Sequence, residues 1–338
     1  MTNRERFVNT LNFKPVDRMP LYEGSTWWNK TIHAWREEGL PKNLDKFGIF
    51  NYWGLDDHRQ IHLLNCEMEI AEYQLEGEED HVKIFIRDES DYEKILPVLY
   101  PDDYLEDSGI ADLLHDLKPA HDAGEFPIWF TTEGYFWFPR VLFGIQPHLY
   151  SFYEQPELYH RICNDLADYH MKLFDEFCSI LVPDYIVMME DMSYNNGPMI
   201  SHDMYNEFVG AYYEKVLPSI KNRGVKVLVD TDGDFTMMIP WMQKSGIDGA
   251  TPLERQAGVD INQIRIDHPE FLMLGGFDKM TMSRGEKAMR QEFERLIPIM
   301  KSGGYILSVD HQTPPNVTME NYKIYRQLQD EYCNKYHC

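Results

Sequence analysis

The sequence predicts an α/β fold, a TIM (β/α)8 barrel with an N-terminal helical extension and a β-hairpin insertion. Short apolar runs end abruptly in polar residues, as where Val227–Val229 lead into Asp230. Longer segments with apolar residues at helical spacing separate these runs, so strand and helix alternate. The length of 338 residues suits one barrel of roughly 250 residues plus additions, and we expect a single domain over 1–338.

The N-terminal third predicts the additions to the barrel. Residues 1–13 have the pattern of an amphipathic helix with Phe7 and Leu11 on one side, and Leu21–Gly24 are typical of a first strand. Residues 63–90 alternate between apolar and polar on both sides of a turn that contains Gly77, which indicates a hairpin. Such an insertion either packs over the barrel mouth or decorates the surface without function.

From Ile128 onward the alternation becomes regular. Strands are predicted at 128–133, 184–190, 227–230, 271–274 and 305–309. Helices are predicted at 156–180, 207–223 and 286–301. Pro156 suits the first turn of a helix. Because all strands of a parallel barrel end at one mouth, we expect the polar residues that follow them to share a pocket.

Charge and composition exclude several classes of partner. The net charge of -24 argues against nucleic acid, which needs clustered Lys and Arg. The N-terminus has no apolar signal region and no run approaches the length of a membrane span, so we expect a cytoplasmic protein. The five cysteines form no CxxC pair, and none stands beside a strand-end carboxylate, so we expect no thiolate chemistry.

Acidic residues and one histidine follow the predicted strands and are the candidate site residues. Glu190 follows one strand, Asp230 and Asp232 follow the next, Glu254 follows a third, and His311 comes after Val309 and Asp310. A single carboxylate in such a place can also be a helix N-cap. Polar residues follow four successive predicted strands, 184–190, 227–230, 271–274 and 305–309, and this succession favours a functional pocket.

Several short motifs resemble those of the uroporphyrinogen decarboxylase superfamily, and the resemblance covers essentially the whole chain. The motifs are Asn3–Phe7, Asp17–Pro20, Glu190–Ser193, Gly197–Ser201, Gly275–Lys279 and Gly303–Ile306. The resemblance implies a barrel with one of two chemistries. These are cofactor-free decarboxylation of a tetrapyrrole, or methyl transfer to or from a corrinoid, usually assisted by zinc.

The decarboxylase branch carries an Arg-Gln-Ala-Gly-Arg loop after its first strand, which holds substrate carboxylates. Here the corresponding place contains Tyr22, Glu23, Trp27 and Trp28 and has no arginine. A substrate with many carboxylates would meet an acid and aromatic rings in a chain of charge -24. The resemblance therefore favours the methyltransferase branch.

In the methyltransferase branch, His-x-Cys-Gly and a later Cys bind zinc. The resemblance places these three ligands on Asp230, Asp232 and His311 of this chain. Every ligand type differs, yet each replacement can bind a metal, so we expect a divalent metal, first of all zinc. The alternative is a hydrogen-bonded polar cluster without an ion.

The sequence thus predicts a metal-dependent methyltransferase that moves a methyl group from a small methoxylated or methylated substrate to a corrinoid (cobalamin) carried by a partner protein. Glu190 and Glu254 are candidates for a fourth ligand or a proton donor. The expected substrate-binding residues are Tyr22, Glu23, Trp27, Trp28 and Trp137. Two alternatives remain: a cofactor-free decarboxylase or lyase, and a non-catalytic protein that binds a small molecule or corrinoid.

Overall fold

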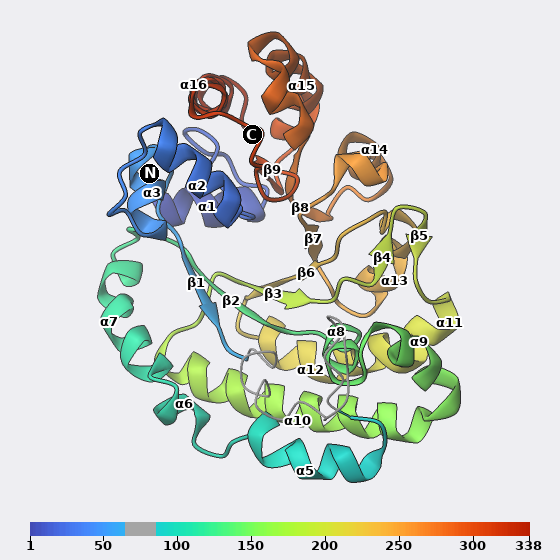
Figure 1. Cartoon of the computed structure of the whole chain (residues 1–338). Coiled ribbons are helices and arrows are strands. Elements are labelled where there is room, and N and C mark those ends of the chain that lie inside the picture. Colours follow the sequence, from blue (N-terminus) through green and yellow to red (C-terminus); the bar gives the residue numbers. More distant parts are fainter. Residues whose placement is uncertain (65–85) are drawn as a thin grey trace.

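The computed structural model of the chain describes residues 1–64 and 86–338, and its centre is a curled parallel sheet (Figure 1). Seven strands run in the order β1-β2-β3-β6-β7-β8-β9. They are β1 Arg59–His62, β2 Ile128–Glu133, β3 Tyr185–Met189, β6 Lys226–Asp230, β7 Gly249–Thr251, β8 Leu272–Phe277 and β9 Tyr305–Val309. A separate antiparallel pair, β4 Ser193–Tyr194 and β5 Gly197–Pro198, lies after β3.

Most helices surround the outer face of the sheet, and the first helix lies beneath its inner face (Figure 1). At the N-terminal end they are α1 Asn3–Leu11, α2 Asn29–Glu38, α3 Lys46–Tyr52, α5 Glu89–Leu99, α6 Tyr104–Asp107 and α7 Ile110–Asp122. The central ones are α8 Trp137–Phe143, α9 Ile145–Glu154, α10 Pro156–Ile180, α11 His202–Tyr205 and α12 Ala211–Lys221. The last are α13 Ile239–Lys244, α14 Ile261–Asp267, α15 Glu286–Met300 and α16 Met319–Lys335. Within 1–64 and 86–338, no helix is long and apolar enough to cross a membrane.

The sheet has the parallel order of a barrel, but β1 and β9 are not paired, so the predicted closed barrel is not formed. The predicted strand Leu21–Gly24 is not a strand either. This segment lies between the two edges: the amide of Asp56, just before β1, donates to Leu21 O at 2.9 Å, and Gly24 N donates to Ser308 Oγ at 3.0 Å. This segment is therefore held by a side-chain acceptor and a single backbone bond at these points, in place of a continuous ladder.

The inner face of the sheet forms a small apolar core that α1 closes from below. Alternate residues of each strand point inward, and the inner set includes Tyr185, Leu228 and Ile306. Phe7 of α1 inserts beneath them, with its ring stacked on Tyr185 at 5.3 Å between centroids. Thr2 and Glu5 cap this helix reciprocally. The amino-terminal helix therefore forms the floor of the lumen.

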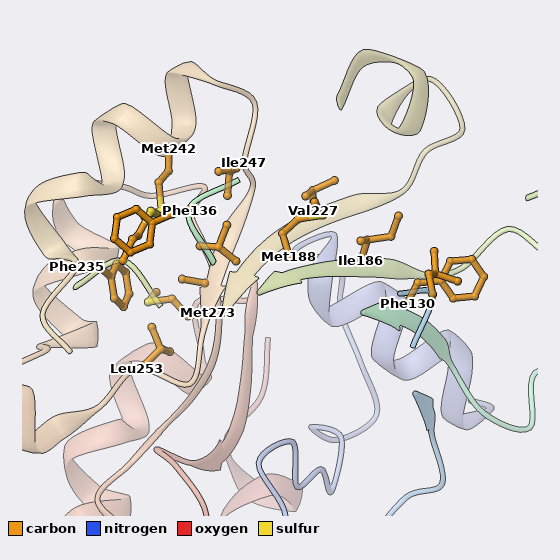
Figure 2. Close-up of a cluster of buried hydrophobic side chains, with 14 of the residues drawn as sticks. Phe130, Phe136, Ile186, Met188, Val227, Phe235, Met242, Ile247, Leu253 and Met273 are labelled. Carbon is orange, nitrogen blue, oxygen red and sulfur yellow. The ribbon is translucent and has the colours of Figure 1, made fainter. Parts of the chain in front are cut away.

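The outer face forms the main hydrophobic core. Figure 2 shows Ile186 and Met188 of β3 near Val227 of β6, and Met273 of β8 near Phe235 and Leu253, all of them in this core. Because side chains alternate, residues next to these point into the lumen. Asp230 shares the inner face with Leu228, since the two are two residues apart on β6. The carboxyl end of the lumen is thus polar.

Most predicted elements of the second half are confirmed. The helix predicted at 156–180 is α10, and the strand predicted at 305–309 is β9. The predicted 207–223 helix is broken into a π-helical turn and α12. The hairpin predicted within 63–90 falls mainly on residues 65–85, outside the described residues.

Candidate active site

A cavity of about 420 Å³ opens at the carboxyl ends of the strands. One wall is acidic and includes Asp191, Asp230 and Asp232. His311 and Trp137 also line the cavity. Its position fits the rule that parallel barrels bind ligands at this end.

Asp232, Glu254 and His311 come together at this mouth. One ligand atom from each lies within 4.8 Å of the other two, and all three side chains are half-buried. His311 Nε2 is 3.6 Å from Asp232 Oδ2. The three residues follow β6, β7 and β9 respectively, so the parallel sheet itself brings them together.

Glu254 is held by neighbouring loops. Its Oε2 accepts a hydrogen bond from Gly233 N at 3.2 Å, and its Oε1 is 3.2 Å from Lys279 Nζ. Gly233 has φ 82, and a Cβ there would lie 2.5 Å from the Tyr194 backbone. Only glycine fits this turn without strain. The turn after β6 therefore fixes both Asp232 and the carboxylate of Glu254.

Asp310 anchors the two loops that carry Glu254 and Lys279. It is fully buried and accepts hydrogen bonds from the amides of Arg255, at 3.0 Å, and Lys279, at 3.1 Å. Burial raises the pKa of this carboxyl to about 6, against the opposing effect of the Lys279 charge. Asp310 therefore positions the site and does not itself face the cavity.

Asp230 lies in the cavity but outside the close group of donor atoms. Burial, with added repulsion from Asp232, Asp191 and Glu254, raises its pKa to about 8. The predicted ligand set of Asp230, Asp232 and His311 therefore differs from the observed group in one member. Asp230 is the last residue of β6 and its side chain lies on the inner face, whereas Glu254 reaches the donor group from the loop after β7.

Glu190 is buried beneath the mouth and organises the turn after β2. Its oxygens accept hydrogen bonds from the amides of Tyr135, at 3.0 Å, Phe136, at 2.7 Å, and Trp137, at 3.2 Å, and from the Tyr213 hydroxyl. Burial raises its pKa to about 7 against these donors. With both oxygens engaged, Glu190 fits a positioning role for Trp137 better than a ligand role.

Two backbone features support this arrangement. A Cβ on Gly134 would lie 2.2 Å from Cδ of Glu190, so the carboxylate can reach the turn only because residue 134 is glycine. Asp191 has a left-handed backbone with φ 43, and its side chain accepts from Arg140 at 2.8 Å. Non-glycine residues in this conformation are uncommon and gather at functional sites.

Comparison with known proteins identifies the family. The sequence model of the uroporphyrinogen decarboxylase family matches residues 127–332, which is more than half of the chain. The chain belongs to the uroporphyrinogen decarboxylase family. The resemblance of the short motifs to this superfamily is thereby confirmed. A search of curated proteins found no match.

A solved structure shares the fold of this chain. A methyltransferase from Methanosarcina mazei aligns with a TM-score of 0.67 and 14% identity, over 98% of this chain and 99% of that chain. A B12-independent methionine synthase from a Shewanella species aligns at a TM-score of 0.43 with 11% identity, over 65% of each chain. A putative vitamin-B12 independent methionine synthase from Listeria monocytogenes aligns at 0.43 with 13% identity, over 95% of this chain and 98% of that chain. The last two alignments are too loose to support an inference.

In this family member the loop that follows the predicted first strand contributes small residues to the cavity and not its aromatic rings. Gly24, Ser25 and Thr26 line the cavity. Tyr22 is buried in the inner core, with its hydroxyl 3.0 Å from that of Tyr185. Glu23 is buried and accepts a hydrogen bond from Ser308 Oγ at 2.6 Å.

The predicted tryptophans have three different environments. Trp27 is buried against Trp35 and Tyr322, with centroid distances of 5.9 Å to each, so it belongs to the core. Trp28 is 40% exposed and precedes α2. Trp137 lines the cavity, and the Arg140 guanidinium lies 5.0 Å from its ring centroid. Of the five expected substrate contacts, Trp137 is the one on the cavity wall.

Sequence reasoning missed several cavity residues, among them Lys46, Gln60 and His62. Gln60 and His62 belong to β1, a strand of only four residues that precedes the insertion. The alternation of Gln60, Ile61 and His62 was the available signal, because the isoleucine is buried and the two polar residues share the other face. Lys46 has no comparable signal, since it begins a short helix far from the strands in sequence.

The group of Asp232, Glu254 and His311 fits a divalent metal by its chemistry. Two ligands bound at about 2.1 Å to a tetrahedral ion lie about 3.4 Å apart, and the His311–Asp232 distance of 3.6 Å is close to this value. Two carboxylates and one imidazole suit a catalytic zinc site with an open position, and also other divalent ions. Burial and repulsion from Asp232, Asp191 and Glu254 together raise the pKa of Asp230, and this concentration of acids beside Lys279 favours an added positive charge.

Proposed function

We propose that this member of the uroporphyrinogen decarboxylase family is a metal-dependent methyltransferase. In this proposal it moves a methyl group from a small methylated substrate to a corrinoid carried by a separate protein. The observation that carries the proposal is the meeting of Asp232, Glu254 and His311 at the mouth of a cavity. A decarboxylase without a cofactor has no need of such a donor group.

A divalent ion held by these three residues would act as a Lewis acid on the heteroatom that loses its methyl group. The remaining roles belong to the chain. Lys279 and the amide of Gly233 orient the Glu254 carboxylate. Trp137 offers an apolar surface beside the substrate, and Glu190 holds the turn that carries it. The half-buried site limits water around the reacting group.

The cavity walls do not suit uroporphyrinogen decarboxylation. Among the described residues that line the cavity, none is an arginine, and Asp191, Asp230 and Asp232 face it. A substrate with many carboxylates would be repelled by this wall. We therefore expect no coproporphyrinogen to form from uroporphyrinogen at rates comparable with those of a true decarboxylase.

The proposal is tested by metal analysis together with a methyl-transfer assay. The protein is stripped with a chelator and reloaded with zinc, manganese or cobalt, and the bound metal is counted. Each form is then mixed with cob(I)alamin and a panel of methoxylated aromatics and methylated amines, and methylcobalamin formation is followed by its visible spectrum. We expect about one ion per chain and activity that disappears on stripping and returns on reloading.

Asp232→Asn serves as the active-site variant, and Asp267→Asn, an exposed aspartate of α14, serves as its matched control. The control should keep full activity. Ether demethylation should greatly exceed thiol methylation, because a thiolate would bring another anion to a centre already neutralised by carboxylates. Robust thiol methylation without ether demethylation would show that the methyl group moves from the corrinoid to the substrate, opposite to the proposed direction. Absence of bound metal after reloading would refute the proposal.

A further inference from the structure

The cavity has two walls of opposite character. The acidic wall holds Asp191, Asp230 and Asp232, while Lys46, Gln60 and His62 line the cavity from β1 and α3. In the sheet, β1 lies at one edge and β6 lies three strands away. The separation of these strands places the two sets of residues on different sides of one cavity.

Lys46 brings an uncommitted positive charge to this wall. No ion pair or hydrogen bond of its ammonium occurs within residues 1–64 and 86–338, whereas the cavity's other nearby lysine, Lys279, is paired with Glu254. The charge of Lys46 acts on this wall, because it contributes to lowering the pKa of His62. A cation without an acidic partner at a cavity is available to an anionic ligand.

The side chains of Gln60 and His62 lie on the same face of the sheet, since the two residues are two positions apart on β1. Between them, Ile61 is buried in the main core. Gln60 Nε2 donates to Thr131 Oγ1 at 3.1 Å, which fixes the amide and leaves a second N–H for a ligand. The imidazole of His62 has no hydrogen-bond partner among the described residues. Together with Lys46 they offer several donors on one side of the cavity.

We propose that Lys46, Gln60 and His62 bind a carboxylate of the substrate, so that the substrate is a small methylated carboxylic acid. The carboxylate site does not depend on the proposed methyl transfer. Only the claim that the bound acid carries a methyl group rests on the proposed function. The acidic wall repels a carboxylate, so the acid group must face Lys46 and the other end of the molecule must face Asp232, Glu254 and His311. The two walls together set the direction in which the substrate lies.

The dimensions of the cavity limit the size of this acid. A volume of about 420 Å³ lies in the lower part of the range for small-molecule sites. Trp137 supplies a flat apolar surface along the wall, which suits an aromatic ring. Methoxybenzoates combine a carboxylate, a ring and a methyl ether in a molecule of suitable size, and they are the probes for the test.

Binding is measured by calorimetry for the 2-, 3- and 4-methoxybenzoates and for the matching methoxybenzamides, which keep the shape and lose the charge. At least one acid should bind about tenfold or more tightly than its amide. Lys46→Met should reduce this preference to about one. Lys42→Met is the matched control, because it removes the same charge from a lysine that is 78% exposed and does not line the cavity.

The outcomes separate the two proposals. If no acid binds more tightly than its amide, or if the preference survives in Lys46→Met, the carboxylate site is refuted. If the preference behaves as expected but no acid transfers its methyl group to cob(I)alamin, the carboxylate site stands and the proposed function fails. Thermal unfolding of Lys46→Met close to that of wild type confirms that the loss is local, and His62→Gln should weaken acid binding in the same direction.

Discussion

Metal binding at the donor group should stabilise the fold by an amount that follows from the ratio of the free metal concentration to the dissociation constant. At a free zinc concentration of 100 times the dissociation constant, binding to the folded state alone adds about 2.7 kcal/mol to the free energy of unfolding. For a chain of 338 residues, with an unfolding entropy of about 2.1 cal/mol/K per residue, this raises Tm by about 4 °C. The shift should be measurable by calorimetry or by dye-based melting.

Asp232→Asn should nearly abolish this shift. The substitution keeps the side-chain shape but removes one of the three donors that lie within 4.8 Å of one another. Loss of even an outer-shell partner weakens metal sites by about 10–100-fold, and a direct donor should cost at least the upper value. A 100-fold loss at the same zinc concentration leaves about 0.4 kcal/mol, or less than about 1 °C in Tm.

The control for this experiment is Asp267→Asn, whose carboxylate is exposed and bonds only to Gln263 among the contacts described. It should show the full zinc-dependent shift. Without metal, Asp232→Asn should be as stable as wild type or slightly more so, because the carboxylate repels Glu254 and Asp191. An equal zinc shift in wild type and Asp232→Asn would show that zinc binds elsewhere and would refute the assigned site.

Three further predictions concern the buried carboxylates. Glu190→Ala should lose about 3 kcal/mol in urea unfolding, because several buried donors lose their acceptor, while Glu190→Gln should lose less. Gly134→Ala should cost about 1–3 kcal/mol in the same assay, since its Cβ would lie 2.2 Å from Glu190 Cδ; a melt unchanged from wild type would contradict the packing described. Burial raises the pKa of Glu23 from 4.5 to about 7, so its contribution to stability is full below pH 4.5 and is lost as pH rises through 7. Relative to Glu23→Gln, wild type should therefore lose up to about 3 kcal/mol of unfolding free energy between pH 4.5 and 8. A difference between the two proteins that stays constant over this pH range would argue against a buried ionisable Glu23.

The parts of the fold that sequence predicts well are those with long or regular patterns. The 25-residue helix α10 begins at Pro156 and shows helical periodicity throughout. β9 is a run of mainly apolar residues before Asp310. Asp232 and His311 could be predicted because each follows such a strand. The sequence of the second half therefore predicts both its helices and strands and part of the candidate site.

The remaining features depend on contacts between distant segments. β1 has four residues, of which only Ile61 is buried, so its alternation is too short to separate it from the insertion. Glu254 follows β7, a strand of three residues, and its approach to Asp232 depends on the turn at Gly233. Lys46 reaches the cavity from a helix whose position is set by tertiary packing. Such features cannot be read from periodicity.

The floor of the lumen has a consequence for how the chain can fold. Helix α1 is synthesised well before β9, yet the amide of Gly304 donates to Thr10 O at 2.8 Å and Phe7 lies in one core with Ile306. The inner core therefore stays incomplete until a segment almost 300 residues later has been made. Contacts of such sequence separation slow folding and delay the closing of the apolar interior. On the ribosome, the nascent sheet would keep its inner face in contact with water and available to chaperones until β9 has emerged.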